Sequence, residues 1–196
     1  MRSTRHQGYG SVTVLALIIA CFLVYIATIV AALTDYPLML LLGLQPAAFL
    51  ARPWTIVTNL FVHGGLWHLI ANMMTLFFFG RFLAGLIGTR AFLTIYFVGG
   101  IVGNIFFMLM GSPFAVVIGA SGAVFALGGT LVVLTPKLRV FVFPIPVPLP
   151  LWVAMFGGFI IMSFFPNVAW QGHLGGMISG LVAGLVLRNK MRRFSY

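Results

Sequence analysis

Acidic side chains are almost absent from this chain of 196 residues, which has one aspartate, Asp35, and no glutamate. Carboxylates are the usual partners of a catalytic metal ion or of a histidine in a Ser-His-Asp triad. Cysteine is equally scarce, because Cys21 is the only one, so no intramolecular disulfide can form. With so few carboxylates and thiolates, the four histidines offer too small a ligand set for metal-dependent hydrolysis. We therefore expect no metal ion and no cofactor.

Charged residues of either sign make up only 6% of the chain, whereas hydrophobic residues make up 62% and the mean hydropathy is +1.16. A soluble domain of this length does not have such a composition. The sequence therefore predicts a protein that crosses a membrane several times.

Six apolar segments are candidates for membrane-spanning helices. They lie near residues 12–33, 67–86, 91–110, 121–134, 149–165 and 172–187. The first three contain the roughly 20 residues that a helix needs to cross a bilayer, and the other three are shorter. Glycine and proline clusters separate the segments, as expected for connections between helices. We predict an all-α bundle of six transmembrane helices that forms one membrane domain over residues 1–196.

Residues 34–53 form a long connection after the first predicted helix. The stretch is apolar at its centre but is broken by Gly43, Gln45 and Pro46. Such a segment is too interrupted to span a membrane. We expect it to form an external loop that lies in the membrane interface.

Basic residues lie almost entirely on one side of the predicted topology. With six spans, that side holds Arg2, Arg5, Arg81, Arg90, Lys137, Arg139, Arg188, Lys190, Arg192 and Arg193. Only Arg52 and Asp35 fall on the other side. Positively charged loops remain in the cytoplasm, so both termini are predicted to be cytoplasmic in a multi-pass plasma-membrane protein. The net charge of +10 then reflects topology and attraction to anionic membrane lipid, and implies no binding of nucleic acid.

Two polar residues, Ser121 and His173, begin the fourth and sixth predicted helices. These two helices run in the same direction, so their first residues lie at the same face of the membrane. The fourth segment has about 14 residues and a length of roughly 21 Å, less than the hydrocarbon thickness of about 30 Å. Ser121 is therefore predicted to lie below the external surface, in a water-filled pocket that opens to the external face.

His68 and Asn72 lie four residues apart near the external end of the second predicted helix, and so share one helical face. Taken singly, each of these polar residues has a structural explanation. Ser121 is in a position typical of a helix cap, and His173, His68 and Asn72 are suited to hydrogen bonds between helices. Their placement at one depth favours a catalytic site, because polar residues inside a membrane usually serve function.

Three motifs resemble those of the rhomboid family of intramembrane serine proteases. They are HLIAN at 68–72, GASG at 119–122, and His173 followed by Gly176 and Gly180. The resemblance covers nearly the whole chain and implies a protease that cuts transmembrane proteins. It implies Ser121 as nucleophile, His173 as base, and His68 with Asn72 as donors to the oxyanion. His63 also matches a histidine of the family pattern and is expected to play a supporting role, as a bond between the external loop and the bundle.

The residues themselves support the same chemistry. A serine hydroxyl needs a base, and a neutral histidine is the suitable side chain near pH 7. No carboxylate is available to orient that histidine, so a Ser-His dyad is predicted. Phe125 lies four residues after Ser121 and is placed to pack against His173. Backbone N–H groups at the start of the fourth helix, including that of Ser121, point toward a developing oxyanion.

Glycines explain how two helices can bring the dyad together. Gly176, Gly180 and Gly184 form a stripe along the sixth predicted helix, and Gly122 offers a matching small surface on the fourth. Small residues allow close approach of membrane helices. With Gly119 in the turn before Ser121, this stripe predicts contact between Ser121 and His173.

Related sequences commonly carry a glutamate in a Gly-x-x-x-Glu-x-x-x-Gly pattern, where this chain has Ala84 between Gly80 and Gly88. We expect this difference to affect the helix bundle rather than the chemistry. Two other functions remain open on the sequence. One is a catalytically silent rhomboid-like protein that binds membrane clients, against which the intact dyad argues. The other is a transporter, against which the lack of an inverted repeat argues. Neither a particular substrate nor an oligomeric state follows from the sequence.

Overall fold

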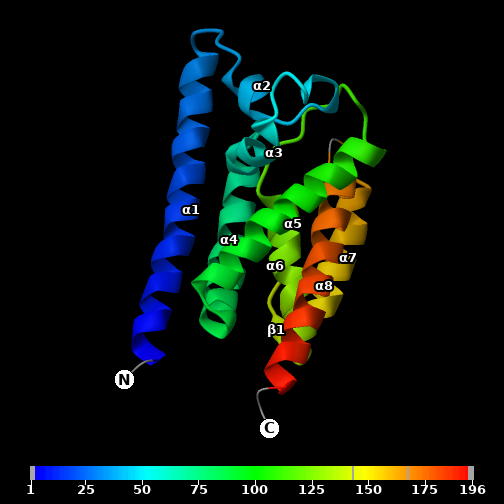
Figure 1. The fold of residues 1–196 in the computed structure, drawn as a ribbon. Helices are drawn as coiled ribbons and strands as arrows, with labels where there is room; N and C mark the ends of the chain where they lie inside the picture. The colour runs from blue at the N-terminus through cyan, green and yellow to red at the C-terminus, as the bar shows by residue number, and fades with distance from the viewer. Residues whose placement is uncertain (1–2, 143, 167, 194–196) are drawn as a thin grey trace.

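The computed structural model describes residues 3–142, 144–166 and 168–193, and side chains from residue 10 to residue 190 within these ranges. Long helices stand side by side, and α1 begins at the same end of the bundle at which α8 ends (Figure 1). The short elements α2 and α3 lie together at the opposite end. The two ends of the described chain therefore share one end of the molecule.

A long helix occurs at each of the six predicted places. These helices are α1 (Ser3–Ala32), α4 (Leu66–Ile87), α5 (Thr89–Met110), α6 (Ser121–Leu134), α7 (Leu151–Ser163) and α8 (Trp170–Arg193). The predicted bounds of the fourth segment agree with α6, while α8 extends beyond the predicted 172–187 into basic residues at its end. Gly88, with φ of +85°, allows the sharp turn between α4 and α5.

Three helical stretches in the described chain are long and apolar enough to cross a membrane. They are Gly10–Ala32, Leu66–Ile87 and Thr89–Met110. Helices α6 and α7 are apolar but shorter. The chain is therefore a mainly helical membrane protein, and the crossing by all six helices remains a prediction.

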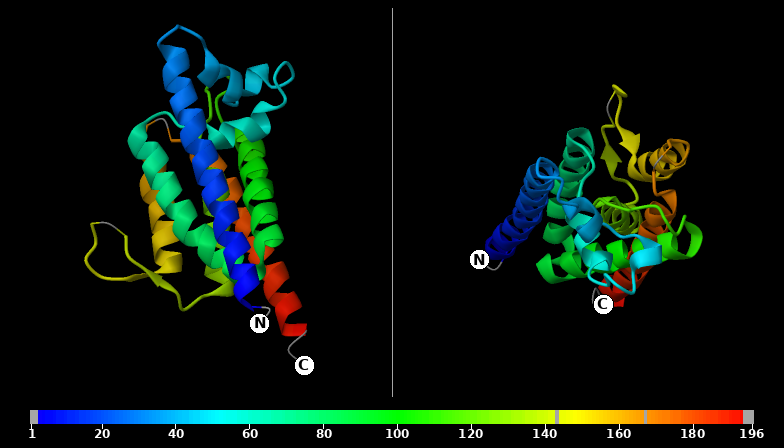
Figure 2. Two further views of the ribbon diagram at one scale, coloured as in Figure 1. Left: turned by 90° about the vertical axis from the view of Figure 1, so that its left-hand side faces the viewer. Right: turned by 90° about the horizontal axis from the view of Figure 1, so that it is seen from above.

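Helix α6 is the centre of the bundle. All nine residues from Ala123 to Leu131 are buried, and the helix contacts α4, α5, α7 and α8 (Figure 2). A helix that is apolar on every side is stable only when neighbouring helices surround it. Because α6 is enclosed in this way, its first residue, Ser121, is held inside the bundle.

Residues 34–53 form no spanning helix, as predicted. They contain only the short helices α2 (Leu38–Leu42) and η1 (Pro46–Ala48), and are followed by α3 (Thr55–Thr58) and η2 (Asn59–Phe61). Three side chains donate hydrogen bonds to successive carbonyl oxygens of this loop: Arg52 to Leu40, Trp54 to Leu41 and Thr58 to Leu42. These bonds satisfy carbonyl groups that the end of a short helix leaves free.

The proline-rich connection between α6 and α7 forms a small antiparallel hairpin of β1 (Arg139–Val140) and β2 (Leu149–Pro150). It projects from the side of the bundle, near the end that holds the start of α1 and the end of α8 (Figure 2). Helix α1 packs mainly on α4, where Ala84 is buried against Gly10. Ala84 thus has a packing role, in agreement with the expectation that this position affects the bundle.

Candidate active site

Ser121 and His173 lie in direct contact at the start of α6 and near the start of α8. The His173 Nε2 atom is 2.8 Å from the Ser121 Oγ atom, within hydrogen-bond distance. His173 is 4% exposed. When Nε2 accepts the hydroxyl proton of the serine, the imidazole must carry its own proton on Nδ1. This geometry is the one required of a base that activates a serine.

Glycines on α8 make this contact possible, as the sequence predicted. A Cβ atom added at Gly176 would overlap the carbonyl oxygen of Gly122, and one added at Gly180 would overlap that of Ala126. The two helix backbones are therefore close enough that any side chain on this stripe would separate them. The same close packing sets the distance between Ser121 and His173.

Phe125 stacks on the imidazole ring of His173, which confirms the predicted packing. The ring centroids are 4.6 Å apart and the planes are inclined by 22°. The His173 Nδ1 atom is buried and has no hydrogen-bond partner among the described residues. Asp35, the only acidic residue, is exposed in the turn after α1. The orientation of the imidazole therefore depends on packing rather than on a carboxylate.

His68 lies against the turn that precedes Ser121. Gly119 in this turn has φ of +116°, and a Cβ atom there would be 2.8 Å from both Cε1 and Nε2 of His68. Only glycine suits this position, because the backbone conformation and the neighbouring ring both exclude a side chain. The Nε2 atom of His68 therefore faces the backbone next to Ser121.

Asn72 is buried one turn below His68 on the same helix. Its side-chain nitrogen donates to the carbonyl oxygen of His68 at 2.8 Å. The amide retains a second N–H group, which is free to donate to another acceptor. The structure thus places His68 beside the serine turn and attaches Asn72 to its own helix.

His63 is fully buried, but it does not bond the external loop to the bundle as predicted. Its Nδ1 atom is 3.2 Å from the carbonyl oxygen of Phe61, only two residues away, because the chain turns locally before α4. The Nε2 atom has no partner among the described residues. The ring instead contacts the ring of His68 edge-on, with centroids 5.1 Å apart.

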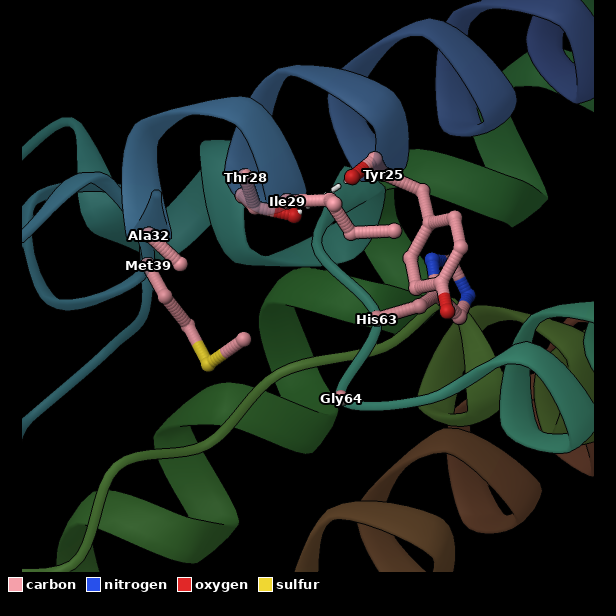
Figure 3. Close-up of a pocket in the computed structure, with 7 residues that line it drawn as sticks. All are labelled: Tyr25, Thr28, Ile29, Ala32, Met39, His63 and Gly64. Atoms are coloured by element: carbon pink, nitrogen blue, oxygen red, sulfur yellow. Dashed lines mark hydrogen bonds between the residues drawn. The ribbon is translucent and has the colours of Figure 1, made fainter. Parts of the chain in front are cut away.

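His63 also forms part of the wall of a cavity of about 150 Å³ between α1, the external loop and the start of α4 (Figure 3). Tyr25, Thr28 and Met39 line the same cavity. Burial and, to a smaller extent, the neighbouring His68 lower the pKa of His63 to about 4, against the opposing effect of the bond to the Phe61 carbonyl. His63 is therefore neutral at physiological pH.

Sequence reasoning missed two buried asparagines, Asn59 in η2 and Asn104 in α5. Their side-chain amides are joined by two hydrogen bonds of 2.9 Å. The backbone carbonyl of Asn59 also accepts a hydrogen bond from the Gly119 N–H at 2.9 Å. Asn104 lies inside the apolar segment 91–110, and a polar side chain in such a segment usually has a specific hydrogen-bond partner. This position could therefore have been recognised in the sequence.

Comparison with known proteins identifies the family of the chain. The family model for the rhomboid domain matches residues 50–190. YdcA of Bacillus subtilis (strain 168), which is assigned to the rhomboid proteases, is 30% identical over 143 residues, covering 72% of this chain and 71% of that protein.

Two further relatives carry protease names. Rhomboid-like protease 3 of Toxoplasma gondii is 34% identical over 149 residues, covering 73% of this chain and 56% of the relative. Rhomboid protease GluP of Bacillus subtilis (strain 168) is 31% identical over 135 residues, covering 68% of this chain and 26% of the relative. The chain thus spans only part of these longer proteins. The matched rhomboid domain and these identities show that the chain belongs to the rhomboid family.

Proposed function

We propose that this protein is an intramembrane serine protease in which Ser121 is the nucleophile and His173 is the general base. The contact of 2.8 Å between Ser121 Oγ and His173 Nε2 carries the proposal. The protease names of its relatives support hydrolysis of peptide bonds as the class of reaction. Transmembrane proteins are the proposed substrates, because the site lies within a bundle of apolar helices.

The first half of the reaction forms an acyl-enzyme. Ser121 Oγ attacks the carbonyl carbon of the scissile bond while His173 Nε2 takes the hydroxyl proton. Backbone N–H groups at the start of α6 stabilise the negative oxygen of the tetrahedral intermediate, and His68 and Asn72 are the proposed side-chain donors. As the C–N bond breaks, His173 returns the proton to the leaving amine. The second half repeats these steps with water as the nucleophile, and releases the new carboxyl end and free Ser121.

The substrate must present an extended peptide bond to Ser121. In a helix the scissile carbonyl is hydrogen-bonded and shielded, so residues of low helix propensity near the cut favour cleavage. We further propose that the six long helices form one domain over residues 1–196 and cross the plasma membrane, with cytoplasmic termini. The active site then opens to the external face, and cleavage occurs near the external end of the substrate helix.

The test is cleavage of a single-span substrate in proteoliposomes, beside the variants Ser121→Ala and His173→Ala. We expect both variants to abolish cleavage while their thermal unfolding remains close to that of the parent. A serine-directed fluorophosphonate should label the parent at Ser121 and fail to label Ser121→Ala. A folded parent that neither cleaves several such substrates nor accepts the label would contradict the proposal and favour a rhomboid-like protein that binds clients without cutting them.

A further inference from the structure

Asn59 and Asn104 form a reciprocal amide pair in the part of the bundle next to the serine turn. The Asn59 Nδ2 atom donates to Asn104 Oδ1, and the Asn104 Nδ2 atom donates to Asn59 Oδ1, each at 2.9 Å. The second N–H of Asn104 donates to the carbonyl oxygen of Ile56 at 2.8 Å. Both asparagines are buried, with exposed fractions of 0% and 4%. Three hydrogen bonds therefore attach the segment that contains α3 and η2 to α5.

Packing holds this segment on α5 at the same place. Leu60, which follows Asn59, is buried, and a Cβ atom added at Gly100 of α5 would lie 2.8 Å from both of its δ carbons. The glycine thus makes room for the leucine beside the amide pair. Polar and apolar contacts together determine where the backbone of Asn59 lies.

The backbone of Asn59 in turn holds the turn before the proposed nucleophile. Its carbonyl oxygen accepts the N–H of Gly119 at 2.9 Å. Gly119 packs against the ring of His68 and is two residues before Ser121. Residues 111–120 are not helical, so the helix ladder does not constrain them and they depend on such external bonds.

We infer that Asn59 and Asn104 are positioning residues, whose amide pair fixes the Gly119 turn and thereby the attack geometry of Ser121. This inference rests on the proposed function of Ser121. No hydrogen bond joins the side chains of the pair to Ser121 or His173 among the described residues, so the action of the pair passes through the Gly119 backbone. A displacement of about 1 Å of a reacting group is enough to lower a rate by up to about a hundredfold.

The test compares Asn59→Ala, Asn104→Ala and the milder Asn104→Ser with Thr130→Val. Thr130 is the control, because it is fully buried and its one hydroxyl proton is shared between the Ala126 carbonyl oxygen of α6 at 2.9 Å and the Gly180 carbonyl oxygen of α8 at 3.0 Å, with no bond to the serine turn among the described residues. All variants lose a buried interhelical bond. We expect similar losses of thermal stability in Thr130→Val and the asparagine variants.

Two readouts separate positioning from stability. Hydrogen exchange of the peptide that contains Gly119 should become faster in the asparagine variants and remain at the parent rate in Thr130→Val. The value of kcat should fall at least about tenfold in the asparagine variants, with little change in KM, because chemistry rather than binding is affected. The double variant Asn59→Ala with Asn104→Ala should be no slower than Asn104→Ala, which by itself already loses both bonds of the pair and the bond to Ile56.

Asparagine variants with the kcat of Thr130→Val and an unchanged exchange rate at Gly119 would overturn the inference. A parent that is inactive toward both substrate and fluorophosphonate would contradict the proposed function. In that case, faster exchange at Gly119 in the asparagine variants would still support attachment of the turn by the pair, and unchanged exchange would contradict it.

Discussion

Single residues decide how the proposed catalytic base is oriented. In a serine protease triad a carboxylate holds the histidine through Nδ1. Here the Nδ1 atom of His173 is buried without a hydrogen-bond partner among the described residues, and an aromatic ring takes over the orienting role. Phe125 contributes no hydrogen bond, so stacking on its ring and the contact with Ser121 itself keep the imidazole aligned.

Replacement of Phe125 tests this role. Phe125→Leu retains an apolar side chain but removes the ring that stacks on His173. We expect kcat to fall about tenfold with little change in KM, because the imidazole spends less time aligned with the serine. Phe97→Leu is the control, since Phe97 pairs with Phe61 and Tyr96 rather than with His173. Equal kcat values in the two variants would show that stacking has no special role.

His63 should make the stability of the protein dependent on pH. Burial lowers its pKa from the ordinary 6.5 to about 4 in the folded protein, so between these values the unfolded chain binds more protons. The free energy of unfolding should therefore be greatest above about pH 6.5 and should decrease as the pH falls toward 4, by up to about 3 kcal/mol.

Unfolding of the parent and of His63→Gln, measured from pH 7.5 to pH 4 in the same detergent, provides the check. The variant should lose much of the pH dependence, because glutamine does not titrate. The pH dependence that remains in the variant comes from the other ionisable groups. Parallel curves for the two proteins would rule out His63 as the source.

At the scale of elements, the bundle depends on glycines placed where helix backbones meet. On α8 the stripe of Gly176, Gly180 and Gly184 faces α6, and all three positions lack room for a side chain. On α7, by contrast, Gly157 and Gly158 have nothing within 4 Å of a Cβ position. The same residue type therefore has a structural role on one helix and none that is visible on the other.

Gly180→Ala should force α6 and α8 apart, because the new Cβ atom would overlap the carbonyl oxygen of Ala126. We expect a loss of about 1–3 kcal/mol in the free energy of unfolding. Activity should fall as well, since Ser121 and His173 are on the separated helices. Gly158→Ala is the matched control and should be neutral or slightly stabilising, because alanine favours helix. A harmless Gly180→Ala would mean that the two helices are not in tight contact.

The close packing of α1 on α4 can be tested in the same way by substitution of Ala84. This residue is 2% exposed, and a Cβ atom added at Gly10 would lie 3.0 Å from its own Cβ. Ala84→Glu, which introduces the residue common in related sequences, should therefore destabilise the protein by about 2 kcal/mol or more, since a carboxyl group would be overpacked and buried. Gly85→Glu places the same group in open space and should cost much less. Equal thermal stability of the two variants would contradict this packing.

At the scale of the whole molecule, α1 begins and α8 ends at the same end of the bundle, opposite α2 and α3 (Figure 1). This arrangement agrees with an even number of crossings but does not identify the side of the membrane. The basic residues, which gather at that end in the predicted topology, supply the expectation that it is cytoplasmic.

Single cysteines introduced into a Cys21→Ala background test the topology. Ala51→Cys lies in the external loop and Lys190→Cys near the end of α8, and both side chains are exposed. A membrane-impermeant maleimide should label the first in intact cells and the second only after lysis. Cys21 is the one natural cysteine and is replaced so that only the introduced cysteine can react. The reverse labelling pattern would invert the proposed orientation.

The sequence by itself determined the class of protein, the places of the long helices and the residue types of the candidate site. Hydropathy is a local property, so apolar runs and their glycine and proline boundaries indicate helices without knowledge of the fold. Ser121 and His173 were recognisable because polar residues are few in such a chain. The glycine stripe indicated their contact because glycine removes the obstacle to close approach of two helices.

Only the tertiary structure decided which distant residues meet. The pair of Asn59 with Asn104 and the attachment of Gly119 to the Asn59 carbonyl join segments whose approach no local pattern specifies. Ala84 of α4 likewise packs against Gly10 of α1, which is far from it in the sequence. These contacts follow from the way helices pack in three dimensions, since a side chain's partners depend on the crossing of helices and not on its neighbours in sequence.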